Sequence, residues 1–95
     1  MGKRNRWRRE MSGAEMLMTA AAVVAERRMA YGDPCSSMEL LAKRWSLTLG
    51  QPITAAQVAM CLIDLKLTRL SHDPAHQDSI LDIAGYAAVL HEVVT

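Results

Sequence analysis

The stretch from Thr54 to Leu70, TAAQVAMCLIDLKLTRL, decides the fold class of this 95-residue chain. Thr54 and Gln57 have the spacing of a capping box, in which each side chain bonds the backbone amide of the other. Apolar residues then recur at the three- and four-residue spacing of a helix, beginning with Val58 and Leu62. We therefore predict an amphipathic to nearly all-apolar helix here, and we expect it to be the central helix of the fold.

Capping-box spacing occurs twice more, at Ser12–Glu15 and at Ser36–Glu39. The first box predicts a helix to about Met29 that is broadly apolar and rich in alanine. The second predicts a shorter helix that Gly50 ends, because glycine is common just beyond a helix C-terminus. Two more helices therefore precede the stretch that decides the fold class.

The last helix is expected after Asp73-Pro74, which offers a cap and a first-turn proline; a start at Gln77 is the alternative. Its predicted core stripe is Ile80, Leu81, Ile83, Ala84, Ala87, Leu90 and Val94. Gly85 interrupts this stripe, and glycine in mid-helix costs about 1 kcal/mol relative to alanine. We therefore expect close packing of Gly85 against a neighbouring helix.

Composition agrees with an all-α fold. The chain is 51% hydrophobic and only 4% aromatic, with no Phe, so the core is built from aliphatic residues, Met and Ala. Its length suits one hydrophobic core. We predict an all-α, compact bundle of about four helices, with a single helical domain over residues 11–95.

Residues 1–10 form a basic, flexible arm in this prediction. They carry five basic residues and one acidic residue, a net charge of +4, whereas the remainder carries −3. Such an arm could contact phosphate, anionic lipid or the acidic body, or serve only as a solvated terminus.

The apolar run Met16–Ala25 has half the roughly 20 residues of a membrane span, and Glu15 beside it argues against a secretory signal. Cys35 and Cys61 are expected to be reduced thiols in a cytoplasmic protein.

Several enzyme classes are excluded by their missing motifs. The five glycines form neither a dinucleotide-binding fingerprint nor a phosphate-binding loop. His91-Glu92 lacks the second histidine of a zinc protease. His72 and His76 lie four residues apart, but Pro74 interrupts the helix that would bring them together, which favours loop histidines over a metal site.

One charged cluster is the main candidate for a binding site. Lys66 and Arg69 fall on the third predicted helix, and Asp78 and Asp82 are one turn apart on the fourth. Packed side by side, these helices bring the four charges together. They form either an ion-pair clamp or a nucleotide site, in which Mg or Mn would bind Asp78 and Asp82 and the bases would contact phosphate. The turn Tyr31–Pro34 is a second candidate, or only a turn.

A known family shares an ordered series of residues with this chain: Arg28, Tyr31-Gly32-Asp33-Pro34, Leu41-Ala42, Trp45-Ser46, Leu49-Gly50, Ile53-Thr54, Val58-Ala59, Lys66, Arg69, His76, Asp78-Ser79 and Asp82-x-x-Gly85-Tyr86-Ala87-Ala88. Over about residues 14–93 the chain resembles a family of small phage and prophage proteins known only as a domain of unknown function. It has Ser37 and Gln57 where that family usually has Asn and Asp.

A more distant likeness is to the phage domain called nucleotide modification associated domain 1, and through it to the MazG-like all-α NTP pyrophosphatases. The Glu-x-x-Glu and Glu-x-x-Asp metal motifs of those enzymes are absent from this chain. The resemblance implies a phage-type protein in the host cytoplasm. Under the nucleotide hypothesis, Arg28, Lys66 and Arg69 are predicted to contact phosphate, and Asp78 and Asp82 to contact the ribose or a metal ion. Tyr31 and Asp33 of the turn are the other predicted ligand contacts.

Two functions from different classes are predicted. The first is a phage accessory protein that binds or processes a nucleotide. The alternative is a non-enzymatic protein that regulates or inhibits a host factor through its helical surface. Nucleic acid is a weaker candidate partner because the body is mildly acidic, and no membrane partner is expected. Three of the four helices are apolar on more than one side, so we also predict a homo-oligomer, most simply a dimer.

Deletion of residues 1–10 is predicted to leave the melting temperature nearly unchanged, because this segment lacks the apolar periodicity needed to pack on the core. Thermal unfolding of the full and shortened chains, followed by circular dichroism, measures the difference. A large decrease would contradict the prediction and show that the arm docks on the body.

Overall fold

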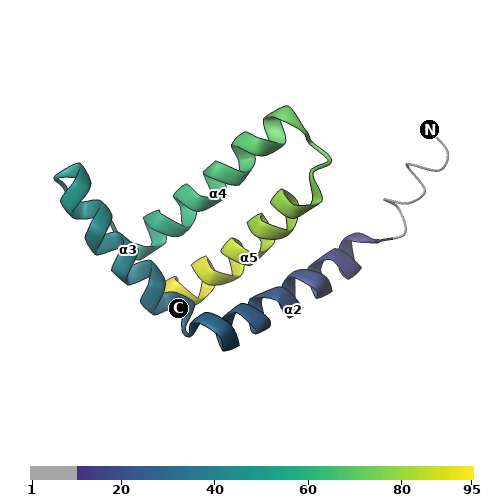
Figure 1. Ribbon diagram of the computed structural model, residues 1–95, viewed down its shortest axis with the longest axis horizontal. Helices are drawn as coiled ribbons and strands as arrows, with labels where there is room; N and C mark the ends of the chain where they lie inside the picture. The colour runs from purple at the N-terminus through teal and green to yellow at the C-terminus, as the bar shows by residue number, and fades with distance from the viewer. Residues whose placement is uncertain (1–10) are drawn as a thin grey trace.

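A computed structural model describes residues 11–95 (Figure 1). Within that range the chain forms four helices and no strand. These are α2 (Gly13–Tyr31), α3 (Pro34–Leu49), α4 (Ala55–His72) and α5 (Gln77–Val94). The predicted all-α bundle is confirmed, whereas the predicted arm lies outside the described residues.

Two of the predicted capping boxes are present. At the start of α2, the Glu15 amide donates to Ser12 Oγ at 3.1 Å and the Ser12 amide donates to Glu15 Oε1 at 2.8 Å. At the start of α4, Thr54 and Gln57 exchange the same two bonds at 3.1 and 2.9 Å. Each box satisfies backbone amides that the first turn leaves unpaired, so the sequence signal and the helix start coincide.

The start predicted for α3 at Ser36 is wrong. The helix begins at Pro34, and Asp33 caps it by accepting a bond from the Cys35 amide at 3.0 Å. Proline suits the first helical position because its fixed φ is already helical and no amide hydrogen is needed there. It also biases Asp33 toward the extended backbone that a cap requires. Ser36 therefore lies inside the helix.

The ends of the other helices also differ slightly from expectation. α2 continues beyond Met29 to Tyr31 and ends at Gly32, whose φ of +87° is unfavourable for other residues. Gly50 ends α3 in the left-handed conformation, as predicted. Asp73 is the C-cap of α4, so the alternative start of α5 at Gln77 is correct, with His76 as its N-cap.

α5 lies between α2 and α4 along much of its length, and α3 crosses the end of this layer (Figure 1). The central helix is therefore α5, and the expectation that α4 holds this place is wrong. α5 is apolar around most of its circumference and can pack on two sides, whereas α4 carries charged Asp64 and Arg69 on exposed positions.

The most buried side chains gather where α3, α4 and α5 meet. Met38 and Ala42 of α3 pack with Val58 and Ala59 of α4, and the α4 pair is fully inaccessible to solvent. Half-buried residues from α5 complete this cluster, together with Trp45. α2 contributes one buried residue, Ala20, so its attachment depends mainly on α5.

Gly85 faces a neighbouring helix, as predicted, but the approach is not close. A methyl group added at Gly85 would lie 3.7 Å from Val24 Cγ2 of α2, which is ordinary van der Waals contact. The α2–α5 packing therefore accommodates alanine at this position without movement.

Gly85→Ala is predicted to raise the free energy of unfolding by about 0.5–1 kcal/mol, because alanine restricts the unfolded chain and favours the helix. Chemical denaturation at one protein concentration measures the change. Gly32→Ala and Gly50→Ala are the matched controls and should lower stability, since both glycines have positive φ. A destabilised Gly85→Ala protein would show that α2 and α5 pack more tightly than described.

Candidate functional site

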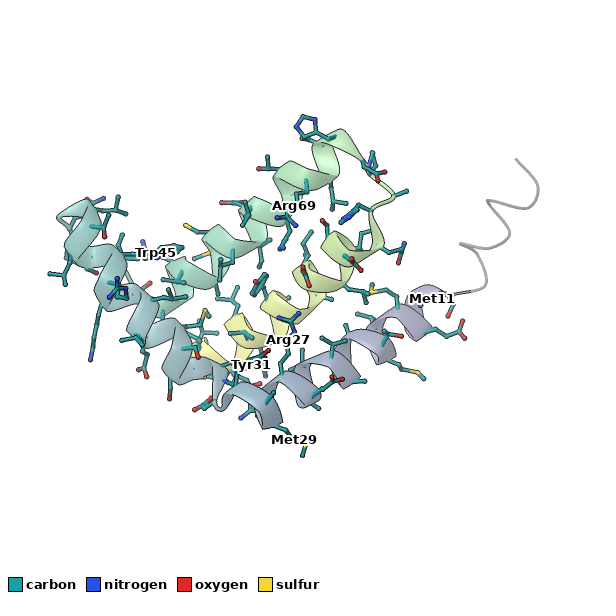
Figure 2. All side chains as sticks on the ribbon, in the orientation of Figure 1. Met11, Arg27, Met29, Tyr31, Trp45 and Arg69 are labelled. Atoms are coloured by element: carbon teal, nitrogen blue, oxygen red, sulfur yellow. The ribbon has the colours of Figure 1, made fainter. Side chains whose placement is uncertain are left out.

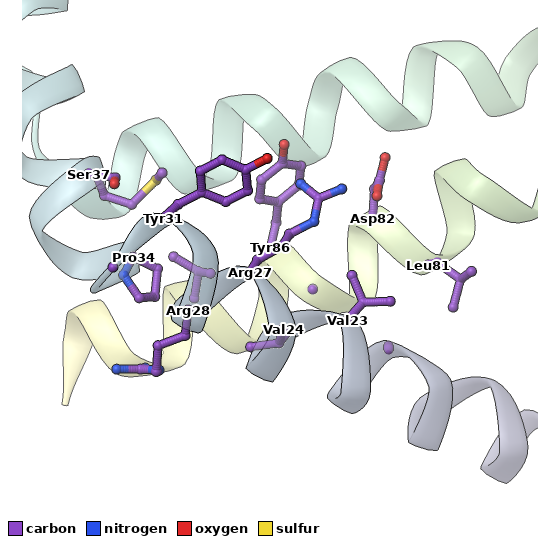
Figure 3. Close-up of a pocket in the computed structure, with 15 residues that line it drawn as sticks. Val23, Val24, Arg27, Arg28, Tyr31, Pro34, Ser37, Leu81, Asp82 and Tyr86 are labelled. Carbon is purple, nitrogen blue, oxygen red and sulfur yellow. The ribbon is translucent and has the colours of Figure 1, made fainter.

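A cavity of about 160 Å³ opens between α2, α3 and α5 (Figure 3). Its polar groups come mainly from Arg27 and Tyr31 of α2 and from Asp82 and Tyr86 of α5. Aliphatic side chains from all three helices form most of the remaining wall, among them Val23, Val24, Pro34, Met38, Leu81 and Val89. The cavity is therefore mainly apolar with a few polar groups, the composition typical of small-molecule sites.

Helical spacing brings the four polar groups together. Arg27 and Tyr31 are one turn apart on α2, and Asp82 and Tyr86 are one turn apart on α5, so each pair shares a side of its helix. Figure 3 shows the Tyr31 and Tyr86 rings side by side, with the Arg27 guanidinium beside Tyr86 and Asp82 further along α5. Two aromatic rings, a cation and a carboxylate thus line one opening.

Asp82 also connects the cavity to α4. Its Oδ2 lies 3.0 Å from Lys66 Nζ, and the Lys66 side chain is only 12% exposed. The prediction that a base of α4 pairs with an acid of α5 is confirmed by this contact. Lys66 thus balances the charge of the Asp82 carboxylate beside the apolar wall.

The other two members of the predicted cluster are not in this ion pair. No salt bridge within residues 11–95 includes Arg69 or Asp78. Arg69 is three residues beyond Lys66 and lies on the side of α4 that faces α5 (Figure 2). Asp78 is exposed in the first turn of α5, where its negative charge suits the helix dipole.

Arg28 and Asp33, predicted as ligand contacts, meet at the opposite end of α5. The Arg28 guanidinium donates a hydrogen bond to the Glu92 carboxylate and lies 3.8 Å from Asp33 Oδ1. The hydrogen bond to Glu92, strengthened by its charge, raises the pKa of Arg28 above its usual value. Arg28 also lines the cavity, whereas Asp33 is occupied as the cap of α3. This trio joins the ends of α2 and α5 to the start of α3.

Potential metal ligands within residues 11–95 gather in one group, Asp33, Cys35 and Glu92, whose ligand atoms lie within 4.8 Å of one another. The Arg28 guanidinium already contacts both carboxylates and offsets one of their two negative charges. Among the described residues, Asp78 and Asp82 do not belong to a comparable group. A metal at that pair stays a prediction.

Sequence reasoning missed Arg27 and Tyr86 as site residues. Both could have been found from their spacing, because each lies four residues from a residue that was chosen, Tyr31 or Asp82. The sequence prediction named Arg28 and not its neighbour Arg27. The two arginines have different surroundings only because α2 packs on α5. Tyr31, Arg28 and Asp82 are the predicted residues that line the cavity.

The family described as "Domain of unknown function (DUF6378)" matches residues 15–94. The chain belongs to this family. The DUF6378 chain is 36% identical over 80 residues to the Gene 55 protein of Mycobacterium phage L5, covering 82% of the chain and 51% of that protein. It is 32% identical over 68 residues to the Gene 55 protein of Mycobacterium phage D29, covering 72% of the chain and 45% of that protein. No solved structure matches.

These findings confirm the predicted resemblance to a phage family of unknown function. The DUF6378 chain spans about half the length of the curated relatives it matches. The more distant likeness to MazG-like enzymes stays a prediction. Within residues 11–95, none of the helices combines the length and apolar content that crossing a bilayer requires.

Iodoacetamide at pH 8 is predicted to alkylate Cys61 faster than Cys35. Burial raises the pKa of the Cys35 thiol, and the Asp33 and Glu92 carboxylates raise it further, whereas Cys61 is exposed. Since the thiolate is the nucleophile, a raised pKa slows the reaction. Peptide mass spectrometry measures both rates in one sample, and equal rates would contradict the prediction.

Glu92→Gln should shift the alkylation profile of Cys35 to lower pH, because one negative charge is removed while Arg28 remains. Cys61 is the internal reference. Equal acceleration of Cys35 at every pH would indicate that the helix junction had opened, and would contradict the electrostatic explanation.

Proposed function

We propose that this DUF6378 protein binds a nucleotide in the cavity between α2, α3 and α5. The observation that carries the proposal is the meeting of Tyr31, Tyr86, Arg27 and Asp82 at one apolar opening. A nucleotide combines a flat apolar base, a hydroxylated sugar and an anionic phosphate, and this set of side chains offers a partner for each part.

The base would contact the tyrosine rings. Tyr31 is 81% exposed although it is a large aromatic side chain, and Tyr86 is half-buried beside it. Stacking of a base on an aromatic ring is worth about 1–3 kcal/mol and needs no particular base. The aliphatic wall behind the rings favours removal of the base from water.

The phosphate would contact Arg27, whose planar guanidinium can form two parallel hydrogen bonds to phosphate oxygens. Asp82, which pairs with Lys66, would accept a hydrogen bond from a sugar hydroxyl or a base amine. Lys66 and Arg69 add positive charge on the α4 side of Asp82. Arg28 would contribute positive charge from the cavity wall. Asp33 would act on the ligand only indirectly, through its contact with Arg28.

Mg²⁺ or Mn²⁺ could accompany the nucleotide at Asp78 and Asp82, which are one helical turn apart. Mg²⁺ commonly uses one or two carboxylates, keeps several waters and binds phosphate oxygens. Asp82 would then exchange part of its contact with Lys66 for the ion. The proposal is binding; hydrolysis would follow only if a metal-bound water were aligned with the phosphate.

A second candidate function is docking on a host protein without catalysis. It is favoured by exposed leucines on α3 and α4, among them Leu40, Leu47 and Leu65, which are 62%, 85% and 50% exposed. Large exposed apolar side chains in groups are typical of interaction surfaces. In that function the nucleotide would be absent or would regulate the docking.

Titration calorimetry with nucleoside mono-, di- and triphosphates, each with and without Mg²⁺, tests nucleotide binding. Arg27→Gln should weaken binding at least tenfold, because it removes the phosphate contact, and Tyr86→Leu should do the same by removing the stacking surface. Arg44→Gln on α3 is the matched control, since Arg44 is exposed and outside the cavity wall.

Two results would contradict the proposal. One is no heat of binding, and no rise in melting temperature, with any of the nucleotides at millimolar concentration. The other is binding that Arg27→Gln and Arg44→Gln weaken equally, which would indicate general charge attraction. Nucleotide binding that requires Mg²⁺ in the unmodified chain, and that no longer responds to Mg²⁺ in Asp78→Asn, would support a metal at Asp78 and Asp82.

A further inference from the structure

α2 has an apolar side that nothing in residues 11–95 covers. Leu17, Met18, Ala21, Ala25 and Met29 follow one another at three- and four-residue spacing, or lie side by side, so they share one side of the helix. Leu17, Met18 and Met29 are 59%, 67% and 89% exposed. Met29 extends from α2 away from α5 (Figure 2).

The same side of α2 continues onto α5. An open groove between the two helices is lined by Leu17, Ala21, Ala25 and Met29 on α2 and by Ala84 and Ala88 on α5. We use the name α2–α5 face for these six residues together with Met18. It differs from the cavity side of α2, which carries Arg27 and Tyr31, and from the side that carries Glu15 and Glu26.

We propose that a second copy of this chain covers the α2–α5 face. The first argument is charge. Arg28 is the one ionisable residue among those that line the groove, and its charge is already paired with Glu92 and Asp33. An identical surface can therefore meet it without placing like charges opposite each other, which is the usual obstacle to self-association.

The second argument is shape. Large side chains, Leu17 and Met29, stand toward the two ends of the face, and Ala21 and Ala25 lie between them. When two copies of α2 pair in opposite directions about the middle of this row, Ala21 of each copy lies near Ala25 of the other, so the helices can approach closely there, and Leu17 of each copy meets Met29 of the other. Opposite directions also place the helix dipoles favourably, and two-fold pairing is the commonest arrangement of identical chains.

The third consideration is size. At about 1.5 Å per residue, the α2–α5 face extends about 18 Å along α2, from Leu17 to Met29, and about 6 Å along α5, from Ala84 to Ala88. Stable interfaces bury about 800 Å² of accessible surface per partner. A second copy would therefore cover this face and also contact neighbouring parts of α2 and α5.

Other occupants fit less well. Nucleic acid and anionic lipid are recognised by clustered lysine and arginine, whereas the groove contains one arginine, Arg28, whose charge is already paired. A second copy on the groove would also affect the ligand cavity. The groove and the ligand cavity share Ala20, Val24 and Arg28, so a partner helix on the groove holds α2 against α5 from behind the cavity.

Light scattering after size exclusion, at micromolar concentration, tests the assignment. The unmodified chain should have twice the monomer mass of 10.5 kDa. Ala25→Glu should convert it to the monomer, because the change places two charges in the apolar contact. Ala30→Glu is the matched control and should leave the dimer intact, since Ala30 is exposed, lines neither the cavity nor the groove, and has no residue of the α2–α5 face three or four positions away.

A monomer mass for the unmodified chain would overturn the proposal. So would a dimer that Ala25→Glu leaves intact, or one that Ala30→Glu disrupts equally. Circular dichroism must show native helix content in both variants. A second test applies where Ala25→Glu fails to fold. Ala25→Cys and Ala21→Cys proteins mixed under mild oxidation should form intermolecular crosslinks, and Ala30→Cys should form none beyond those of unmodified Cys35 and Cys61.

The dimer and the nucleotide site can fail separately. If the chain binds a nucleotide but is monomeric in light scattering, only the proposal of a second copy on the α2–α5 face is overturned. A dimer that binds none of the nucleotides would overturn only the proposed function.

Discussion

α5 lies between α2 and α4 and presents a different side to each neighbour. Its apolar residues reach around most of the helix, so no single partner could cover them. Toward α4 it completes the core that Val58 and Ala59 begin, and toward α2 it contacts Val24 at Gly85. Because α2 contributes little to the central core, its position follows from the packing on α5, and the cavity exists only while that packing holds.

Ion pairs at two places along α5 reinforce this arrangement. Asp82 pairs with Lys66 of α4 in its first half, and Glu92 pairs with Arg28 of α2 near its end. α2 and α5 run in the same direction, which brings their negative dipole ends together, and the guanidinium of Arg28 offsets that repulsion. The same contacts decide which charges remain for a ligand: Arg27 has no salt bridge within the described residues, whereas Arg28 is already engaged.

The two proposals concern opposite sides of α2. One side carries Arg27 and Tyr31 toward the cavity, and another carries the uncovered apolar row from Leu17 to Met29. A helix that is apolar on several sides is expected to be covered on several sides. The position of α2 at the edge of the layer leaves room both for a ligand in the cavity and for a second chain on the α2–α5 face.

The sequence by itself determined the helices, because caps and apolar spacing act within a few residues: Thr54 and Gln57 form their box whatever lies elsewhere, and Gly50 adopts its left-handed turn locally. Local rules failed at Ser36, where the Asp33-Pro34 cap was the stronger of two nearby signals. Only the tertiary structure decided which helix is central and that Arg27, not Asp33, joins Asp82 at the cavity. Those outcomes depend on which sides of separate helices meet, and side-by-side packing of residues far apart in the chain leaves no mark in local spacing.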